Sequence, residues 1–416
     1  MKYKLGFGKD MLGIEIDDKD LLGVMQPNDV KIETSEIEEV RRAVRQPIDS
    51  NRLKDIVKPG EKVVIITSDI TRPMPSKKVL PEILNELYDA GISKKDIKIV
   101  FGMGSHRKHT EQEQRYLVGD EIYEQIECLD SDVDDCVFMG ETSFGTPVNI
   151  FRPVAEADRR ICLGNIEYHY FAGYSGGAKA IMPGVSNREA IQANHSKMVM
   201  AEAKAGEMLS NPVRQDIDEV AKFVSIDFIL NVILDEHKTI IKAVAGHHIA
   251  AHREGCEFLD KLYKVQIAQQ ADIVIVSPGG YPKDINLYQA QKALDNSKHA
   301  VKDGGVVILV ASCKEGLGEH VFEKWMLGAQ SSEEMIEKIQ QHFELGGHKA
   351  AAIAMILEKC DIYLVSDLDA EFVKKLFMKP FKDIERAYNE AIKKTGISSK
   401  VYLMPYGGST LPVLIP

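Results

Sequence analysis

The segment from residue 164 to residue 195 concentrates side chains that can do chemistry. It places His169, Lys179 and His195 around a glycine-rich turn at residues 173–177. Imidazole takes and gives a proton near neutrality and binds metals. A lysine amine neutralises an anion or, once it has lost its proton, forms a covalent bond. Glycines let the backbone approach a ligand closely. Together these residue types indicate a binding or catalytic site.

Polar residues also follow two predicted strands at the point where each strand ends. Asp69 and Arg72 come after the apolar run at 62–68, and His106 comes after the run at 96–102. Ligands of open parallel sheets bind at the carboxyl ends of the strands. We therefore expect these side chains to share a pocket with the glycine-rich segment.

A further group follows the predicted strand at 272–276. Tyr288, Gln289 and Lys292 fall on a predicted helix, with Gln289 and Lys292 one turn apart on the same face. Such a pair alone is typical of a solvated helix face, and a single histidine after a strand is more often a turn or surface residue. Two histidines at strand ends of one sheet edge favour the functional interpretation.

Two other patterns point elsewhere. The stretch GYSGGAKA differs from a P-loop, which needs four residues between its glycines and Ser or Thr after the lysine, whereas Ala180 follows Lys179. Its backbone N–H groups could still face a phosphate. His248, His252 and Cys256 recur at a helical spacing that suits a metal, but no carboxylate accompanies them, so the pattern favours a plain amphipathic helix.

The elements that position these residues alternate between strand and helix. Predicted strands at 62–68, which is rich in β-branched residues, at 96–102 and at 159–165 are separated by helical patterns, and a second series begins near residue 272. Thr110 with Glu113 has capping-box spacing at the start of one predicted helix, and Ser186 with Glu189 has it at the start of another. The alternation predicts an α/β fold in two domains, each with a mostly parallel, Rossmann-like sheet flanked by helices.

The length supports two domains, because 416 residues exceed the roughly 250–300 over which one core usually grows. We expect a discontinuous first domain, residues 1–267 plus 398–416, that carries the site. Residues 398–416 contain a strand and loop pattern that could rejoin this domain. We expect residues 268–397 to form a second α/β domain that closes over the site.

Composition excludes several classes of protein. The net charge of −11 argues against a nucleic-acid-binding surface, which needs clustered Lys and Arg, but allows a local basic pocket for an anionic substrate. We see no signal peptide and no apolar run long enough to cross a membrane. Six scattered cysteines without a C-x-x-C pair predict reduced thiols in a cytoplasmic protein.

Taken together, the motifs resemble the nickel-dependent lactate racemase family. The resemblance rests on SDITRP, GSHRKHT, HYFAGYSGGAKAIMPG, the Asn194–His195 pair and LYQAQK. It implies interconversion of D- and L-lactate by proton-coupled hydride transfer through a bound keto acid. It also implies a nickel pincer nucleotide, which is a thiolated pyridinium mononucleotide that carries nickel, and partner enzymes that mature this cofactor.

The resemblance gives each candidate residue a role. His106 and His169 match the two acid/base histidines, Lys179 matches the lysine that forms a thioamide bond to the cofactor, and His195 matches the nickel ligand. The remaining cofactor positions are Asp69, Ser175, Gly176 and Gly177, with the nucleotide phosphate along the last three. The substrate positions are Arg72, Tyr288, Gln289 and Lys292.

The residue types suit this chemistry. Taking the C2 hydrogen of a hydroxy acid as a proton would put two negative charges on the substrate, whereas taking it as hydride is easier when a base removes the hydroxyl proton. Histidine suits that base, and two histidines provide one for each enantiomer. We expect Arg72 and Lys292 to hold the carboxylate. One histidine suffices for nickel if the cofactor supplies the other donors.

Two other functions stay open. One is the racemisation or epimerisation of a different 2-hydroxy acid with the same cofactor and the same site residues. The other is a protein that carries the cofactor without turnover.

Overall fold

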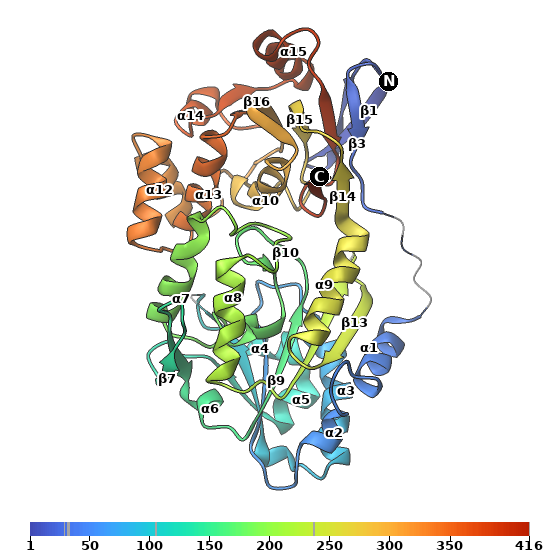
Figure 1. Cartoon of the computed structure of the whole chain (residues 1–416), viewed down its shortest axis with the longest axis vertical. Helices are drawn as coiled ribbons and strands as arrows, with labels where there is room; N and C mark the ends of the chain where they lie inside the picture. The colour runs from blue at the N-terminus through green and yellow to red at the C-terminus, as the bar shows by residue number, and fades with distance from the viewer. Residues whose placement is uncertain (29, 31–33, 105, 236–237, 416) are drawn as a thin grey trace. The chain divides into compact units, whose positions relative to one another are not determined.

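The computed structural model describes residues 1–28, 30, 34–104, 106–235 and 238–415. These residues form two compact units (Figure 1). We call Lys31–Asp260 the central unit, and Met1–Val30 together with Lys261–Pro416 the terminal unit. Among the described residues, each unit is built on a six-stranded sheet.

The sheet of the central unit has the order β13-β12-β9-β4-β5-β6. Its strands are β4 (Val63–Ser68), β5 (Ile97–Gly102), β6 (Glu127–Asp130), β9 (Arg159–Asn165), β12 (Phe228–Leu234) and β13 (Ile240–Gly246). Neighbouring strands are parallel except β13, which runs antiparallel to β12. The carboxyl ends of β4, β5 and β9 therefore meet at one edge, as the sequence predicts.

Helices and short connections complete this unit. They are α1 (Glu36–Arg45), α2 (Leu53–Ile56), α3 (Ser76–Asp89), α4 (Glu111–Val118), α5 (Asp120–Gln125), α6 (Arg152–Ala155), α7 (Arg188–His195), α8 (Pro212–Glu219), α9 (Ala250–Tyr263) and the 3₁₀ turn η2 (Gly177–Ala180). The η2 turn packs against β4 and β9. Helix α9 continues into the terminal unit, since the division falls between residues 260 and 261.

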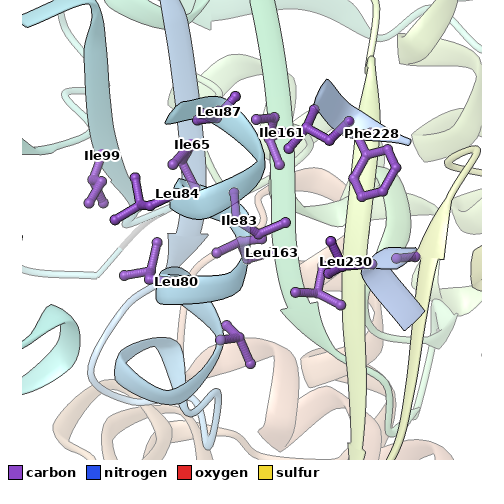
Figure 2. Packing of buried hydrophobic residues seen from close by; sticks show 14 of the residues in the cluster. Ile65, Leu80, Ile83, Leu84, Leu87, Ile99, Ile161, Leu163, Phe228 and Leu230 are labelled. Atoms are coloured by element: carbon purple, nitrogen blue, oxygen red, sulfur yellow. The ribbon is translucent and has the colours of Figure 1, made fainter. Parts of the chain in front are cut away.

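One face of the central sheet is covered by an apolar layer in which α3 takes a large part. Figure 2 shows side chains of α3 lying over the sheet, with Leu80, Ile83, Leu84 and Leu87 facing Ile65, Ile99, Ile161, Leu163, Phe228 and Leu230. All ten are buried. Truncating one such leucine to alanine typically costs about 2–5 kcal/mol of stability, so this layer fixes the strands whose ends carry the site.

Helix caps agree with the sequence in part. Thr110 and Glu113 form the predicted capping box at the start of α4. Asn187, and not Ser186, caps α7, while Ser186 donates its hydroxyl to the carbonyl of Ile181 at 2.9 Å. Because α7 begins at Arg188, Asn187 holds the N-cap position, and its Oδ1 accepts the backbone N–H of Ala190 at 2.9 Å.

Besides the antiparallel pair β12–β13 of the main sheet, two separate two-stranded hairpins lie among the described residues of the central unit. The antiparallel pairs are β7 (Cys136–Glu141) with β8 (Pro147–Phe151), and β10 (Tyr168–His169) with β11 (Gly173–Tyr174). The second hairpin lies inside the glycine-rich segment, so His169 sits on a short strand that leaves the carboxyl end of β9.

The terminal unit has a fully parallel sheet of order β18-β17-β16-β15-β19-β3. Its strands are β3 (Leu21–Val24), β15 (Ala271–Val276), β16 (Val301–Val310), β17 (Asp361–Val365), β18 (Lys379–Phe381) and β19 (Val401–Met404). Its helices are α10 (Leu287–Ser297), α11 (His320–Gly328), α12 (Ser332–Gln341), α13 (Gly347–Leu357), α14 (Ala370–Lys374) and α15 (Ile384–Thr395). Two smaller pairs join β1 (Lys2–Phe7) to β2 (Asp10–Glu15) and β14 (Lys264–Ile267) to β20 (Leu411–Leu414).

The two α/β units confirm the predicted fold class, but the ends of the chain belong elsewhere than predicted. Residues 1–30 and 398–416 lie in the terminal unit and not with the site-bearing domain. The cause is strand pairing, because β19 lies between β15 and β3 and bonds to both. The central unit also ends at residue 260 and not at 267. An apolar strand such as VYLM does not reveal which sheet it joins.

All six cysteines carry free thiols, as their spacing predicts. Within the described part of the chain, no helix is long and apolar enough to cross a membrane.

Candidate active site

The loop after β4 and the loop after β5 bring Asp69 and His106 together. Nδ1 of His106 lies 3.2 Å from Oδ2 of Asp69, and the backbone N–H of Thr71 donates to Oδ1 at 2.8 Å. Burial by itself would raise the pKa of Asp69, but the hydrogen bond and charge of His106, with help from Thr71 and Arg72, lower it to about 2. Asp69 is therefore a carboxylate that accepts the Nδ1 proton, which leaves the lone pair of His106 on Nε2.

A second histidine of the same segment, His109, holds this arrangement in place. Its fully buried ring donates from Nδ1 to Oδ1 of Asp130 at 2.6 Å and accepts the backbone N–H of Ile70 at Nε2, at 3.0 Å. The loop that carries Asp69 is thereby tied to the end of β6. Sequence reasoning missed His109, although its place in GSHRKHT is a signal for it.

Arg72 lies at the border between this pair and the glycine-rich segment. Its Nε is 4.0 Å from Oδ2 of Asp69, and 46% of its side chain is exposed. Its positive charge also contributes to lowering the pKa of both His169 and Lys179. The guanidinium therefore belongs to the same electrostatic site as these two groups.

His169 sits on the hairpin β10–β11 in a half-buried position. Its Nδ1 accepts the backbone N–H of Ala172 at 3.2 Å. The pKa of His169 is well below its ordinary value, first because burial disfavours the charged ring and then because Lys179 and Arg72 repel it. The ring is neutral at physiological pH, and with Nδ1 accepting a bond its proton lies on Nε2.

Side-chain and backbone contacts hold this hairpin firmly. The hydroxyls of Tyr168 and Tyr174 both donate to Oδ1 of Asp260, each at 2.8 Å. Gly173 has a φ of +76°, and a Cβ there would lie 2.1 Å from the carbonyl oxygen of Glu207. Glycine is required at this position because the two backbones touch.

Neighbouring backbone and side-chain groups fix the turn at Ser175, Gly176 and Gly177. The Ser175 hydroxyl donates to the carbonyl of Asn165 at 2.7 Å, and the Gly177 N–H donates to Oδ1 of Asn231 at 2.8 Å. Cβ atoms at the two glycines would lie 2.7 Å from Asn231 and 3.0 Å from the His252 ring. These contacts shape the turn that precedes Lys179, while contact with a cofactor phosphate stays a prediction.

His252, which the sequence assigned to a plain amphipathic helix, supports this turn from α9. Its Nε2 donates to the carbonyl of Ser175 at 2.7 Å, and Nδ1 accepts from Arg253 at 2.7 Å. Burial and the charge of Arg214 lower its pKa to about 3, so the ring is neutral. His252 is a packing residue, and its role depends on a partner far away in the sequence.

Lys179 lies on the η2 turn, where the charges of two arginines act on its amine. Its pKa is well below the ordinary lysine value because of burial and the positive charges of Arg214 and Arg72. Arg214 is fully buried and donates to the carbonyl of Tyr174 and, at 3.4 Å, to that of Ala172. A fixed cation of this kind favours the neutral amine of Lys179, which is the form that can make a covalent bond.

His195 ends α7, and Asn194 holds its ring. Nδ1 of His195 lies 3.0 Å from Oδ1 of Asn194. Because an amide oxygen only accepts, Nδ1 carries the proton and the lone pair lies on Nε2. Metal-binding histidines have this arrangement, with one ring nitrogen donating to a neighbour that orients the ring.

A single buried ring, Phe171, contacts the three chemical groups of the segment. Its centroid lies 4.5 Å from that of His169 and 4.9 Å from that of His195, both edge-on, and 5.9 Å from Nζ of Lys179. Phe171 is only 2% exposed. The structure thus brings His169, Lys179 and His195 around one apolar surface, as the sequence predicts for a shared site.

The described side chains do not form a metal site by themselves. No group of three or more His, Cys, Asp or Glu side chains in the described ranges is arranged to hold a metal ion. His195 therefore fits nickel only if a bound organic group supplies the other donors.

The three remaining candidates lie on the first turns of α10, in the terminal unit. Gln289 and Lys292 are exposed and Tyr288 is half-buried. The Nζ of Lys349 lies 3.8 Å from the centre of the Tyr288 ring and donates to the Tyr288 carbonyl at 2.6 Å. These contacts fix the start of the helix. Contact of the three residues with a substrate stays a prediction.

Known proteins resemble this chain over nearly its whole length. The family model described as the lactate racemase N-terminal domain matches residues 7–207, and the lactate racemase C-terminal domain matches residues 266–412. A lactate racemase of Thermoanaerobacterium thermosaccharolyticum is 34% identical, covering 98% of each chain. A lactate racemase of Lactiplantibacillus plantarum is 33% identical, covering 97% of each.

Solved structures agree with this match. The lactate racemase apoprotein from T. thermosaccharolyticum superposes with a TM-score of 0.90 at 34% identity, covering 99% of this chain and 100% of that chain. A Thermotoga maritima protein shares the fold at a TM-score of 0.63 and 18% identity, covering 91% of this chain and 97% of that chain. With both domain models matched along the chain, this protein belongs to the lactate racemase family.

Proposed function

We propose that this chain is a lactate racemase, an isomerase that interconverts D- and L-lactate. The observation that carries the proposal is the arrangement around Phe171, which contacts a histidine for acid/base work, a lysine with a lowered pKa and a histidine oriented for a metal. The full-length similarity to two proteins named lactate racemase supports the same function.

We propose a nickel pincer nucleotide as the cofactor, with Lys179 as its covalent attachment point and His195 as the protein ligand to nickel. The donor set fits such a group, because the protein offers one oriented imidazole and a lysine whose neutral form is favoured. When bound, the cofactor would supply an acceptor for the C2 hydrogen of lactate as hydride. The maturation enzymes that build it are the proposed protein partners.

His106 takes the hydroxyl proton of the substrate at Nε2 in this proposal. The Asp69 carboxylate accepts the Nδ1 proton, fixes the ring orientation and stabilises the positive charge that the ring gains. Loss of the hydroxyl proton and of the C2 hydrogen converts lactate into a bound keto acid, whose two faces are then both open to return of the hydrogen.

His169 serves the other enantiomer from the hairpin. Its neutral ring offers the Nε2 proton as a hydrogen bond to the substrate oxygen. It takes a proton at Nε2 only as the other neutral tautomer, in which its own proton lies on Nδ1 and the hydrogen bond from Ala172 is lost. Arg72 holds the carboxylate, with Tyr288, Gln289 and Lys292 as the proposed substrate contacts of the other unit. This division gives one histidine to each face of the keto acid.

The test is to produce the chain together with the cofactor-maturation enzymes and to incubate it with pure L- or D-lactate. Chiral chromatography should show the same mixture of enantiomers from either starting material. Mass spectrometry should find a covalent adduct on the Lys179 peptide, and nickel should be retained by the wild type but lost in His195→Gln.

Absence of interconversion by protein that carries nickel would overturn the proposal for lactate. The same assay with a panel of larger 2-hydroxy acids separates a racemase for another substrate. Turnover that persists in both His106→Ala and His169→Ala would contradict the assigned acid/base roles. An unmodified Lys179 in active protein would contradict the covalent link.

A further inference from the structure

Behind His195 lies a buried polar cluster that the proposed reaction does not use directly. Its centre is Asp216 on α8, which is fully buried. Oδ1 accepts the Thr142 hydroxyl at 2.6 Å. Oδ2 accepts from Thr146 at 2.6 Å, from Asn194 at 2.9 Å and from Lys197 at 3.1 Å. A buried carboxylate with this many donors is a fixed acceptor.

The Asn194 amide connects this carboxylate to His195, and its orientation is determined. Its Nδ2 donates to Asp216 and, at 3.3 Å, to the carbonyl of Val213, so that both amide protons have acceptors. The opposite orientation would place the amide oxygen against a carboxylate oxygen and a carbonyl, with no proton between them. The amide oxygen must therefore face Nδ1 of His195.

We propose that Asn194 and Asp216 are positioning residues that keep the His195 proton on Nδ1 and its lone pair on Nε2 for nickel. The Asp216 carboxylate fixes the orientation of the Asn194 amide, and the amide oxygen fixes the tautomer of the His195 imidazole. In the neutral ring, which nitrogen carries the proton is decided by the partner of the other nitrogen. The inference rests on the proposed role of His195 toward nickel. We call the hydrogen bonds that run from Asp216 through Asn194 to His195 the relay, and they are present in the metal-free chain.

The experiment measures the tautomer of His195 in the full-length apoprotein. Protein with ¹⁵N-labelled histidine is recorded by long-range ¹H–¹⁵N correlation NMR at a pH well above the ordinary imidazole pKa. The His195 signals are identified by their loss in His195→Gln. The wild type should show a protonated Nδ1 and an unprotonated Nε2 as a single form.

Two variants break the relay at different points. In Asp216→Ala the Asn194 amide loses its carboxylate acceptor, and in Asn194→Ala the Nδ1 of His195 loses the amide oxygen that accepts its proton. Each folded variant should show a mixture of both tautomers. Thr142→Val is the matched control, because it removes a donor from Oδ1 of the same carboxylate and leaves Asn194 and Oδ2 in place.

A wild-type ring with its proton on Nε2 would overturn the proposal. So would an unchanged single tautomer in whichever of the two relay variants folds, as judged by circular dichroism, or an equal change in Thr142→Val. Nickel retention by His195→Gln tests the ligand role separately. Failure of that role and failure of the relay are thus distinguished.

Discussion

The two histidines assigned to acid/base work occupy opposite electrostatic settings. His106 faces the Asp69 carboxylate, 3.2 Å from its Nδ1, so that a positive ring is stabilised. His169 faces Lys179 and Arg72 and receives a backbone N–H at Nδ1, so that a positive ring is opposed. Neighbouring groups whose surroundings differ in this way are suited to opposite halves of a proton transfer. The comparison indicates that the resting chain has one acceptor and one donor, and not two equivalent bases.

The largest expected effect comes from removing either ring. His106→Ala and His169→Ala should each lower kcat for lactate racemisation by about 10²–10⁴-fold, the usual contribution of a positioned acid or base. The kcat/KM values for the two directions should fall by the same factor, because the equilibrium constant fixes their ratio. His109→Gln, measured beside them, tests a histidine that only supports the loop and should retain more activity. A wild-type kcat in either alanine variant would contradict the acid/base role of that histidine.

Asp69→Asn tests the carboxylate that faces His106. Because the pKa of Asp69 falls from 3.8 to about 2 on folding, its carboxylate stabilises the folded chain above pH 3.8, and this contribution is lost as the pH falls toward 2. The shift corresponds to about 2 kcal/mol. Urea denaturation over this pH range should show a smaller loss of stability on acidification for Asp69→Asn than for wild type. Asp134→Asn, at an exposed position, is the control and should follow the wild type.

Gly177→Ala tests how much the close packing of the turn before Lys179 contributes to stability. With φ at +59° and a Cβ 3.0 Å from the His252 ring, alanine should lower the free energy of unfolding by about 1–2 kcal/mol for the backbone alone. Gly145→Ala is the matched control, because Gly145 has a φ of +74° and open space around its Cβ. Chemical denaturation should find Gly177→Ala the less stable variant. Equal losses would mean that contact with His252 contributes nothing.

The smallest effect is a titration shift in the apoprotein. Lys179→Met removes the largest charge that lowers the pKa of His169, after burial, so the pKa of His169 should rise toward its ordinary value. NMR titration of the histidine C2 proton measures it, with exposed Lys222→Met as control. Below pH 6.5 His169 binds a proton more readily in the unfolded chain than in the folded chain. Wild type should therefore lose more stability than Lys179→Met as the pH falls below 6.5. An unchanged pKa of His169 in Lys179→Met would mean that the charge of Lys179 does not act on the His169 ring.

Local patterns predicted which polar residues lie together at the sheet edge better than they predicted which residues hold them in place. Asp69, His106 and His169 could be named because a polar residue after an apolar β-run lies at a sheet edge wherever the strands are parallel. His109 and His252 could not, because their roles depend on Asp130, Ile70 and the Ser175 carbonyl, which only the folded chain brings near.

The same limit explains the misplaced ends of the chain. The pattern at 401–404 predicts a strand, but its sheet is decided by pairing with β15 and β3, which are distant in sequence. The glycines at 173, 176 and 177 are required by close contact with Glu207, Asn231 and His252, which the sequence pattern does not reveal. Close approach of a ligand to this turn stays a prediction. Sequence identifies the positive φ and the close approach, but not the partner.

In the proposed reaction the two histidines transfer only the hydroxyl proton, while the C2 hydrogen leaves and returns with its electron pair. The direct measurement uses cofactor-loaded protein and L-lactate deuterated at C2 in ordinary water, with chiral separation and mass spectrometry of the product. The account predicts D-lactate that keeps its deuterium. D-lactate that has exchanged deuterium for solvent hydrogen would contradict it, because a histidine would then have removed the C2 hydrogen as a proton.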